Sequence, residues 1–319
     1  SEQFEDREMK GEDIKAYKVI HHNDFAYNPA RINVGSIAKY NGYEPCMISS
    51  LYVCFKANNE VNEDWLMHLL RTPKVQYYYQ LNGEGGVRIY LFYPNFARIR
   101  TSIPSIEEQK KIAKILSIID ERIATQNKII DNLQSLIKGL RELLFKPLLS
   151  YFVKLGNIAQ ITNGSGDVQD AVSDYQNGLY PFFDRSDEMK YFRDYSFDAE
   201  AIIYAGEGAE FLPRYYNGKF ALHQRCYAIT TFSSDFLPRY IYHYLQTQNN
   251  YFIRNAVGST VPSLRIDCFL KIGIPIADKE IQDSIINRLD RLSEKINNEK
   301  NILSLYQRQK TFLLQKLFI

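Results

Sequence analysis

Two long segments of the chain carry apolar residues in the alternating steps of three and four that mark one face of a coiled-coil helix. The first segment runs from about Ser105 to Lys146, and the second forms the last part of the chain. Because an apolar stripe of this length needs a partner, we predict that the two helices pair with each other. The stripe consists of Ile112, Leu116, Ile119, Ile123, Gln126, Ile130, Leu133, Ile137 and Leu140 in the first segment, and of Ile285, Leu289, Leu292, Ile296, Glu299, Leu303 and Leu313 in the second. Gln126 and Glu299 are polar residues at positions that are otherwise apolar.

We expect the two helices to pair in the antiparallel direction. A whole globular segment separates them in the chain. Antiparallel pairing about a pseudo-twofold axis gives a closed, self-complementary contact between the two equivalent helices. It brings Ile112 near Leu317 and Leu144 near Ile285, whereas a parallel pair would bring Ile112 against Ile285. The alternative is that each long helix packs only on its own domain.

The starts of the two long helices resemble each other, which indicates an internal duplication. The first reads "IPSIEEQKKIAKIL" from Ile103, and the second reads "IADKEIQDSIINRL" from Ile276, 173 residues later. This shift places Gln109 on Gln282 without a gap. Apolar positions of two helices often match by chance. A shared Glu-x-Gln at the start and a shared Leu-Phe at the end, Leu144-Phe145 and Leu317-Phe318, in the same register are much less common.

The repeat continues upstream of the long helices. "WLMHLLRT" from Trp65 matches "YIYHYLQT" from Tyr240, and "YNG" at Tyr40 matches "YNG" at Tyr216. Asn-Gly between apolar or aromatic runs is a strong hairpin signal, so we predict a β-hairpin in each copy. The second copy opens with "VKLGNIAQITNGSGD", which the first copy lacks, so we expect the first copy to be truncated at its start.

These patterns predict an α+β protein with two pseudo-repeated mixed α/β domains, separated by two long helices that form an antiparallel coiled coil. The expected ranges are 1–102 for the first domain, 103–147 for the first long helix, 148–275 for the second domain and 276–319 for the second long helix.

Composition and charge narrow the class of protein. Of the 319 residues, 45% are hydrophobic and 24% charged, and no apolar run approaches the roughly 20 residues that a membrane span needs. The polar start of the sequence does not look like a secretory signal, so we expect a cytoplasmic protein. The four cysteines show no CxxC spacing, which favours reduced thiols over a zinc site. A net charge of +2 means that any nucleic-acid binding must come from local basic patches.

The sequence contains "IPSIEEQKKI" at Ile103 with its copy at Ile276, "LGNIAQITNG" at Leu155, and "AIIYAGEGAEFLPRYYNGKFALHQRCYAI" at Ala201. In these stretches it resembles the specificity subunit of Type I restriction-modification systems. In that family each globular unit is a target-recognition domain and each long helix is a conserved spacer. The tandem layout covers essentially the whole chain.

The resemblance implies a reader of bipartite double-stranded DNA without a catalytic role of its own. The implied partners are modification (methyltransferase) subunits, expected to number two, and restriction subunits joined through the complex, with no membrane. S-adenosylmethionine, ATP and Mg would belong to these partners, so we expect neither a cofactor nor a metal in this chain.

The residues agree with the absence of a catalytic role. "YNPARI" at Tyr27 approaches the Asn-Pro-Pro-Tyr/Phe motif of adenine methyltransferases, but Ala30 replaces the second proline and no glycine-rich cofactor loop accompanies it. The sequence also shows no phosphate-binding loop and no nuclease arrangement of acidic residues and lysine.

A DNA reader needs side chains that reach base edges and others that contact phosphates. In the second copy the candidates surround the Asn-Gly pair, with Lys219 expected on the turn. For each single residue the alternative is an ordinary solvated hairpin. These candidates are Arg214, Tyr215, Lys219, His223, Gln224 and Arg225, with Ser259 and Thr260 after a glycine later in the copy.

The first copy offers an equivalent neighbourhood. Its candidates for DNA contact are Tyr27, Asn28, Arg31, Asn33, Lys39 and Ser49, with Arg88 in the loop "GEGGVR". His68 and His243 occupy equivalent places on short amphipathic helices, where we expect a structural role. The main alternative function is a non-catalytic scaffold that binds protein partners through twin tyrosine-rich domains. A nuclease or methyltransferase with an unrecognised site is a third.

Overall fold

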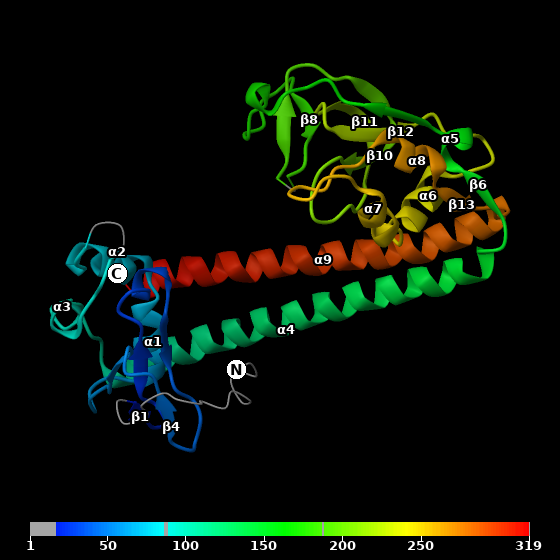
Figure 1. The fold of residues 1–319 in the computed structure, drawn as a ribbon. Coiled ribbons are helices and arrows are strands. Elements are labelled where there is room, and N and C mark those ends of the chain that lie inside the picture. Colours follow the sequence, from blue (N-terminus) through cyan, green and yellow to red (C-terminus); the bar gives the residue numbers. More distant parts are fainter. Residues whose placement is uncertain (1–16, 86–88, 187, 319) are drawn as a thin grey trace. The chain divides into compact units, whose positions relative to one another are not determined.

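The computed structural model describes residues 17–85, 89–186 and 188–318, which form two compact units. Unit 1 consists of residues 1–127 and 301–319, and unit 2 of residues 128–300. This division differs from the ranges expected from the sequence, because each long helix contributes one half to each unit. The long helices are α4, Ile106–Phe145, and α9, Lys279–Leu317 (Figure 1).

The long helices pair in the antiparallel direction, as predicted. In unit 1 the start of α4 lies with the end of α9, since Ile112 and Phe318 pack against the same core. Lys310 of α9 forms an ion pair with Asp120 of α4 in this unit. In unit 2 the end of α4 lies with the start of α9, where Leu144 packs against the core that contains Ile285. Every residue predicted to belong to the stripe is buried or half-buried.

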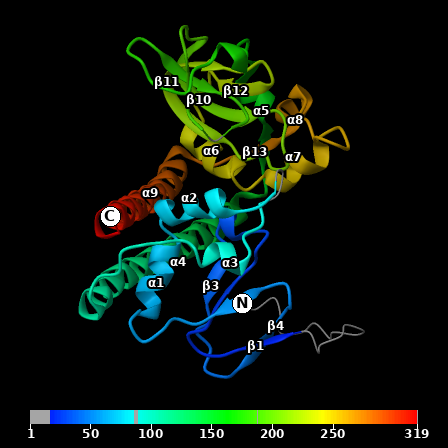
Figure 2. The ribbon, with the colours of Figure 1, turned by 90° about the vertical axis from the view of Figure 1, so that its left-hand side faces the viewer.

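The described part of unit 1 places short strands and short helices around its part of α4 (Figure 2). One antiparallel sheet pairs β1 (Lys18–Ile20) with β4 (Cys46–Ile48), and a second places β2 (Phe25–Tyr27) between β3 (Ile37–Lys39) and β5 (Val53–Phe55). A short 3-10 turn, η3, spans Ile32–Val34. The helices are α1 (Glu63–Leu70), α2 (Pro73–Asn82) and α3 (Tyr93–Phe96). The core contains Phe25, Tyr27, Trp65, Tyr79 and Leu91.

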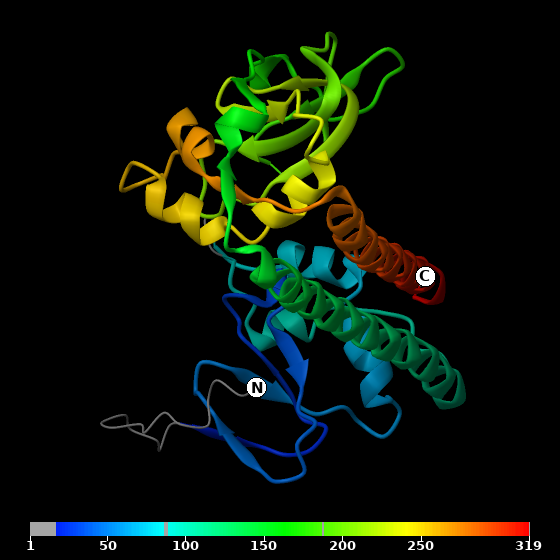
Figure 3. The ribbon, with the colours of Figure 1, turned by 90° about the vertical axis from the view of Figure 1, so that its right-hand side faces the viewer.

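Unit 2 contains a six-stranded sheet that is strongly curved (Figure 3). Its strand order is β7-β12-β10-β11-β8-β9, and all neighbours pair antiparallel except β11 and β8. The strands are β7 (Gln160–Asn163), β8 (Tyr180–Phe183), β9 (Lys190–Phe192), β10 (Phe197–Ala205), β11 (Arg214–Leu222) and β12 (Cys226–Thr230).

Short elements complete unit 2 beside this sheet. The strands β6 (Phe152–Lys154) and β13 (Gly273–Pro275) pair antiparallel. Short 3-10 turns span Lys146–Leu148, shortly before β6, and Val168–Asp170, after β7. The helices are α5 (Leu155–Ile158), α6 (Pro238–Leu245), α7 (Asn249–Asn255) and α8 (Ile266–Lys271). Buried aromatic residues, among them Tyr204, Tyr240 and Phe269, pack the central strands against these helices and against the unit's halves of α4 and α9.

The predicted Asn-Gly hairpins are wrong in both copies. Asn217 and Gly218 lie inside β11, opposite Glu200 and Ala199 of β10. The long neighbouring strand keeps pairing through them, and Gly218 adopts a φ of +129° that only glycine accepts easily. In unit 1 the corresponding pair lies in the connection between β3 and β4, which belong to different sheets.

The four cysteines are free thiols, with Cys226 and Cys268 buried. Burial raises the pKa of the Cys226 thiol to about 11, which keeps it protonated near neutral pH. Within the described ranges, no helix combines the length and the apolar character needed to cross a membrane. The same ranges hold no group of three His, Cys, Asp or Glu side chains arranged to bind a metal ion.

Candidate nucleic-acid interface

The tight turn of unit 2 joins β11 to β12 and carries three of the predicted contact residues, His223, Gln224 and Arg225. Hydrogen bonds from the backbone fix this turn on two sides. His223 N donates to Phe183 O at 2.9 Å, and Gln224 N donates to Gly166 O at 3.0 Å. Cys226 N closes the turn on His223 O at 2.8 Å. The turn is therefore rigid, and its side chains start from a fixed backbone.

Glycines that pack against this turn explain part of the sequence pattern. A Cβ atom on Gly206 would lie 2.0 Å from the carbonyl oxygen of Arg225, and one on Gly164 would lie 2.1 Å from that of Leu222. Side chains at these positions would push the turn away. Gly164 belongs to the opening stretch of the second copy and Gly206 to "YAGEG", so both stretches contain glycine for the same local reason.

The side chains of Gln224 and Arg225 are exposed at the tip of the turn. The Arg225 guanidinium donates from Nη1 to both oxygens of Glu207, at 2.8 and 3.0 Å. Glu207 follows β10 and is held by a β-bridge to Ser263. The arginine is thus anchored at one nitrogen while its side chain remains 64% exposed.

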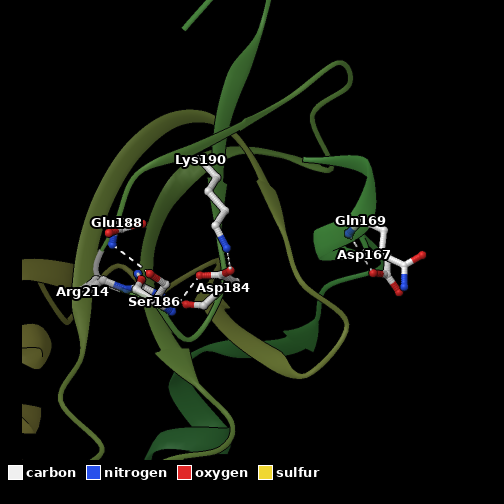
Figure 4. Close-up of polar contacts among 7 residues, drawn as sticks. All are labelled: Asp167, Gln169, Asp184, Ser186, Glu188, Lys190 and Arg214. Atoms are coloured by element: carbon white, nitrogen blue, oxygen red, sulfur yellow. Dashed lines mark hydrogen bonds and ion pairs between the residues drawn. The ribbon is translucent and has the colours of Figure 1, made fainter. Parts of the chain in front are cut away.

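A loop after β8 faces the turn and is organised by the buried carboxylate of Asp184 (Figure 4). Its two oxygens accept hydrogen bonds from Ser186 N at 2.7 Å and from Lys190 Nζ at 2.6 Å. Arg214 donates to Ser186 O at 2.8 Å and also to Asp184 O. Arg214 and Lys190 therefore stabilise the loop, and the prediction that Arg214 contacts DNA does not fit its position.

A cleft of about 580 Å³ lies between this loop and the turn. Its charged lining is balanced, with three carboxylates and three basic groups. These are Asp167, Asp184, Glu207, Arg185, Lys190 and Arg225. The cleft is polar and open, and Gln224 and His223 complete its lining on the side of the turn.

Tyr215 and Lys219 lie on β11 and not on a turn. Tyr215 donates to Glu200 and lies under the Arg239 guanidinium, 4.5 Å from the ring centre. Burial raises the pKa of Tyr215, so this phenol stays protonated and acts as a structural donor. Lys219 is exposed and lies 4.6 Å from the ring centre of Tyr195, and its role at a phosphate stays a prediction.

The predicted residues Ser259 and Thr260 lie on an exposed loop of the same unit. Val257 and Ser263 close this loop through paired backbone hydrogen bonds of 2.9 and 2.8 Å. Because Glu207 bridges to Ser263, the loop joins the segment that holds Arg225. The structure thus brings the turn and this loop together through Glu207.

The predicted contact residues of unit 1 are placed less favourably for binding DNA than those of unit 2. Tyr27 is fully buried in the core, so the prediction that it contacts DNA is wrong. Lys39 is only 12% exposed and pairs with Asp64 at 2.5 Å. Asn28 uses its side-chain oxygen to accept from Ala30 N at 3.0 Å. The remaining candidates are Arg31, which is exposed, Asn33 and Ser49, which are half-buried, and Arg88, which lies outside the described residues.

Sequence reasoning missed Arg185 and Glu207. Arg185 lines the cleft and is exposed, and Glu207 holds Arg225 from a position 18 residues earlier. A contact over that distance leaves no local pattern. The only available signal was the pair of glycines that flank Glu207 in "AGEGA".

The two equivalent histidines lie in the cores of their units. His243 is fully buried, with Nε2 2.8 Å from Asp290 Oδ1 of α9. Burial lowers the pKa of His243 to about 4 and outweighs the opposing effect of Asp290. His68 lies 4.0 Å from Asp120 of α4, and burial lowers its pKa as well. These positions support the structural role expected for both residues.

Comparison with known proteins decides the family. The family model described as "Type I restriction modification DNA specificity domain" matches twice, at residues 15–135 and 149–305. The chain belongs to this family. The tandem match agrees with the duplication read from the repeated sequences, and its two segments cover most of the chain.

Individual members of the Type I specificity family align over shorter stretches. The EcoDI specificity subunit of Escherichia coli is 28% identical over 148 residues, which is 46% of this chain and 32% of that protein. The putative MjaX specificity subunit of Methanocaldococcus jannaschii is 29% identical over 142 residues, 43% of this chain and 33% of that protein. The alignments therefore span about a third of these curated relatives.

The fold matches solved structures over most of its length. The Type I restriction-modification S subunit from M. genitalium superposes with a TM-score of 0.65 at 15% identity, covering 94% of this chain and 83% of that one. A chain from a structure that addresses complex assembly and conformational transition of the type I R-M system gives a TM-score of 0.51 at 15% identity, with 94% and 83% covered. These likenesses establish the specificity-subunit fold.

Proposed function

We propose that this chain is the DNA-specificity subunit of a Type I restriction-modification complex and that each unit reads one half of a bipartite DNA target. The observation that carries the proposal is the presence of two tandem specificity domains joined by paired long helices. Membership of this family favours DNA reading over a protein-binding scaffold. The rigid turn of unit 2, which presents Gln224 and Arg225, supplies side chains suited to adenine and guanine.

The partners are modification subunits, two in number, with restriction subunits joined through the complex. Exposed apolar residues on the long helices support a protein partner. On α4 in unit 2, Ile129, Leu136 and Leu143 recur every seven residues and are 38%, 58% and 66% exposed. In unit 1, Leu305 and Phe312 of α9 are 62% and 57% exposed. Such faces, separate from the buried stripe, suit the helices of another protein.

The chain itself contributes recognition and no chemical step. In this proposal S-adenosylmethionine, ATP and Mg are bound by the partner subunits. Two observations support this recognition role. The family is described as a DNA specificity domain, and the exposed polar residues of the candidate interface are suited to base edges and phosphates.

A duplex-binding assay with a salt titration tests the proposal. Contacts to phosphates release counterions, so the logarithm of the binding constant should fall steeply and linearly with the logarithm of the salt concentration. The assay uses the full chain, alone and with the modification subunits of its own system. Binding that is insensitive to salt, or no binding in either form, would contradict the proposal and favour a scaffold for proteins.

A further inference from the structure

We propose that Arg225 reads a guanine in the half-site of unit 2 and that Glu207 is the residue that positions it. This inference rests on the proposed function and names the base that one side chain recognises. It starts from the fixed backbone of the turn, where three hydrogen bonds and two closely packed glycines hold residues 223–226 in place.

The guanidinium of Arg225 is oriented before any DNA binds. Glu207 accepts two hydrogen bonds from Nη1, at 2.8 and 3.0 Å. Among the described residues, no other group bonds to this guanidinium, so the edge formed by Nε and Nη2 points away from Glu207 with its donors available. Two parallel N–H donors on one edge match O6 and N7 of guanine in the major groove.

The surroundings favour a base over a phosphate. Glu207 places a carboxylate directly beside the arginine, and the cleft below contains two further carboxylates, Asp167 and Asp184. Three negative groups against three basic groups leave little net attraction for a phosphate. A base edge carries no net charge, and its acceptors need donors held in a defined direction, which the Glu207–Arg225 pair supplies.

Glu207 also explains why arginine and not lysine stands at this position. The guanidinium can bind Glu207 through one nitrogen and still offer two donors from its other edge, whereas an ammonium group has no second edge in a fixed plane. Arg225→Lys therefore keeps the charge and the anchoring carboxylate but removes the bidentate donor.

The test selects binding sites from a duplex library with a randomised centre. The full chain with its modification subunits is compared with the same complex carrying Arg225→Lys, Glu207→Gln or the control Arg254→Lys. Arg254 is exposed on α7 of the same unit and does not line the cleft. We expect Arg225→Lys to reduce the preference for guanine at one position of one half-site by about tenfold or more. Glu207→Gln should weaken the same preference, and Arg254→Lys should leave every preference unchanged.

The outcomes separate this assignment from the proposed function. If the wild-type complex selects a split motif and Arg225→Lys leaves each position of that motif unchanged, the assignment is wrong and the proposed function stands. If the wild-type complex selects no motif, both fail together. A uniform loss of affinity in Arg225→Lys, with the guanine preference retained, would place Arg225 on a phosphate and also overturn the assignment. Thermal unfolding of each variant confirms that the exposed substitutions leave the fold intact.

Discussion

Gln109 and Gln282, which lie 173 positions apart, make the same three hydrogen bonds, each within its own unit. Both side chains are fully buried near the start of a long helix. Each accepts one bond from a backbone N–H at the start of a short helix, and each donates to one carbonyl of the loop before that helix and to one just before its own helix. In unit 1 the partners are Asn62 N, Glu60 O and Pro104 O at 2.7, 3.0 and 2.9 Å, and in unit 2 they are Leu237 N, Asp235 O and Ala277 O at 2.8, 2.9 and 2.8 Å.

Gln282→Leu should destabilise unit 2 strongly, because leucine fills a similar volume but leaves one N–H and two carbonyl groups of partly buried hydrogen bonds without this partner. At roughly 1–3 kcal/mol for each unsatisfied group, we expect a loss of about 3 kcal/mol or more in the free energy of unfolding. Gln134→Leu, at an exposed position of α4 in the same unit, is the matched control and should change it by less than about 0.5 kcal/mol. Equal effects in denaturant titrations would show that the buried network is not needed.

Gly206→Ala should displace the turn that carries Arg225, because the added Cβ would lie 2.0 Å from a backbone oxygen. We expect a loss of about 1–3 kcal/mol in stability, together with weaker recognition of one half-site. Gly139→Ala provides a control of opposite sign, since Gly139 lies inside α4 with open space around it, and alanine should stabilise that helix by up to about 1 kcal/mol. An unchanged melting temperature and an unchanged half-site in Gly206→Ala would refute this explanation of the glycine.

His243 should make the protein less stable as the pH falls below neutral. Its pKa is about 4 in the folded state, well below the usual value of 6.5, so the unfolded chain binds a proton in this window and the folded chain does not. The contribution is complete above pH 6.5 and declines between there and pH 4 by at most about 1.4 kcal/mol per pH unit. Asp290, whose pKa is lowered, adds to the loss only at lower pH.

The free energy of unfolding as a function of pH measures this effect. His243→Gln removes the titrating ring and should flatten the dependence between pH 6.5 and 4, leaving the smaller contribution of His68, whose pKa is also lowered. A slope that is the same in the variant and the wild type would contradict the assignment of this dependence to His243.

The polar stripe residues Gln126 and Glu299 should set the register of the long helices. Each is only 7% exposed. A polar residue in such a stripe weakens packing but restricts the allowed register. The double substitution Gln126→Leu with Glu299→Leu should therefore keep or raise stability and loosen the preference for one spacer length between the half-sites. Site selection with libraries of varied spacer length tests this, and an unchanged spacer preference would rule out the register role.

The purified chain alone should neither methylate nor cleave DNA, because the proposed role is recognition only. The assay uses the chain with S-adenosylmethionine, ATP and Mg, after rigorous removal of modification and restriction subunits. Methyl transfer or cleavage that survives this purification would overturn the non-catalytic role. Addition of the modification subunits should produce methylation, which shows that the purified chain is active in recognition.

The sequence was sufficient to predict the parts of the fold that depend on long periodic patterns. The heptad spacing around Leu116 and Leu289 predicted two long helices, and both residues are fully buried. The repeat of Gln109 and Gln282 was also visible in the sequence, because two copies of one local arrangement leave matching residues at a constant shift.

Features that depend on distant neighbours were not predictable. Asn217-Gly218 looked like a turn, but pairing with β10 extends the strand through it. Tyr27 looked available for DNA, but its aromatic ring belongs to the core. Glu207 was missed because its link to Arg225 depends on how β10 and β12 pair, which no local pattern specifies.

The DNA-reading role of this chain is tested most directly by the set of methylated DNA motifs in cells that carry the complete system. Sequencing that detects methylated adenine is applied to three otherwise identical strains, one with the wild-type chain, one with the chain deleted, and one with Arg225→Lys. We expect a split motif in the first strain, its loss in the second, and a change confined to one half of the motif in the third. The same methylated motifs with and without the chain would contradict the claim that it reads the DNA target.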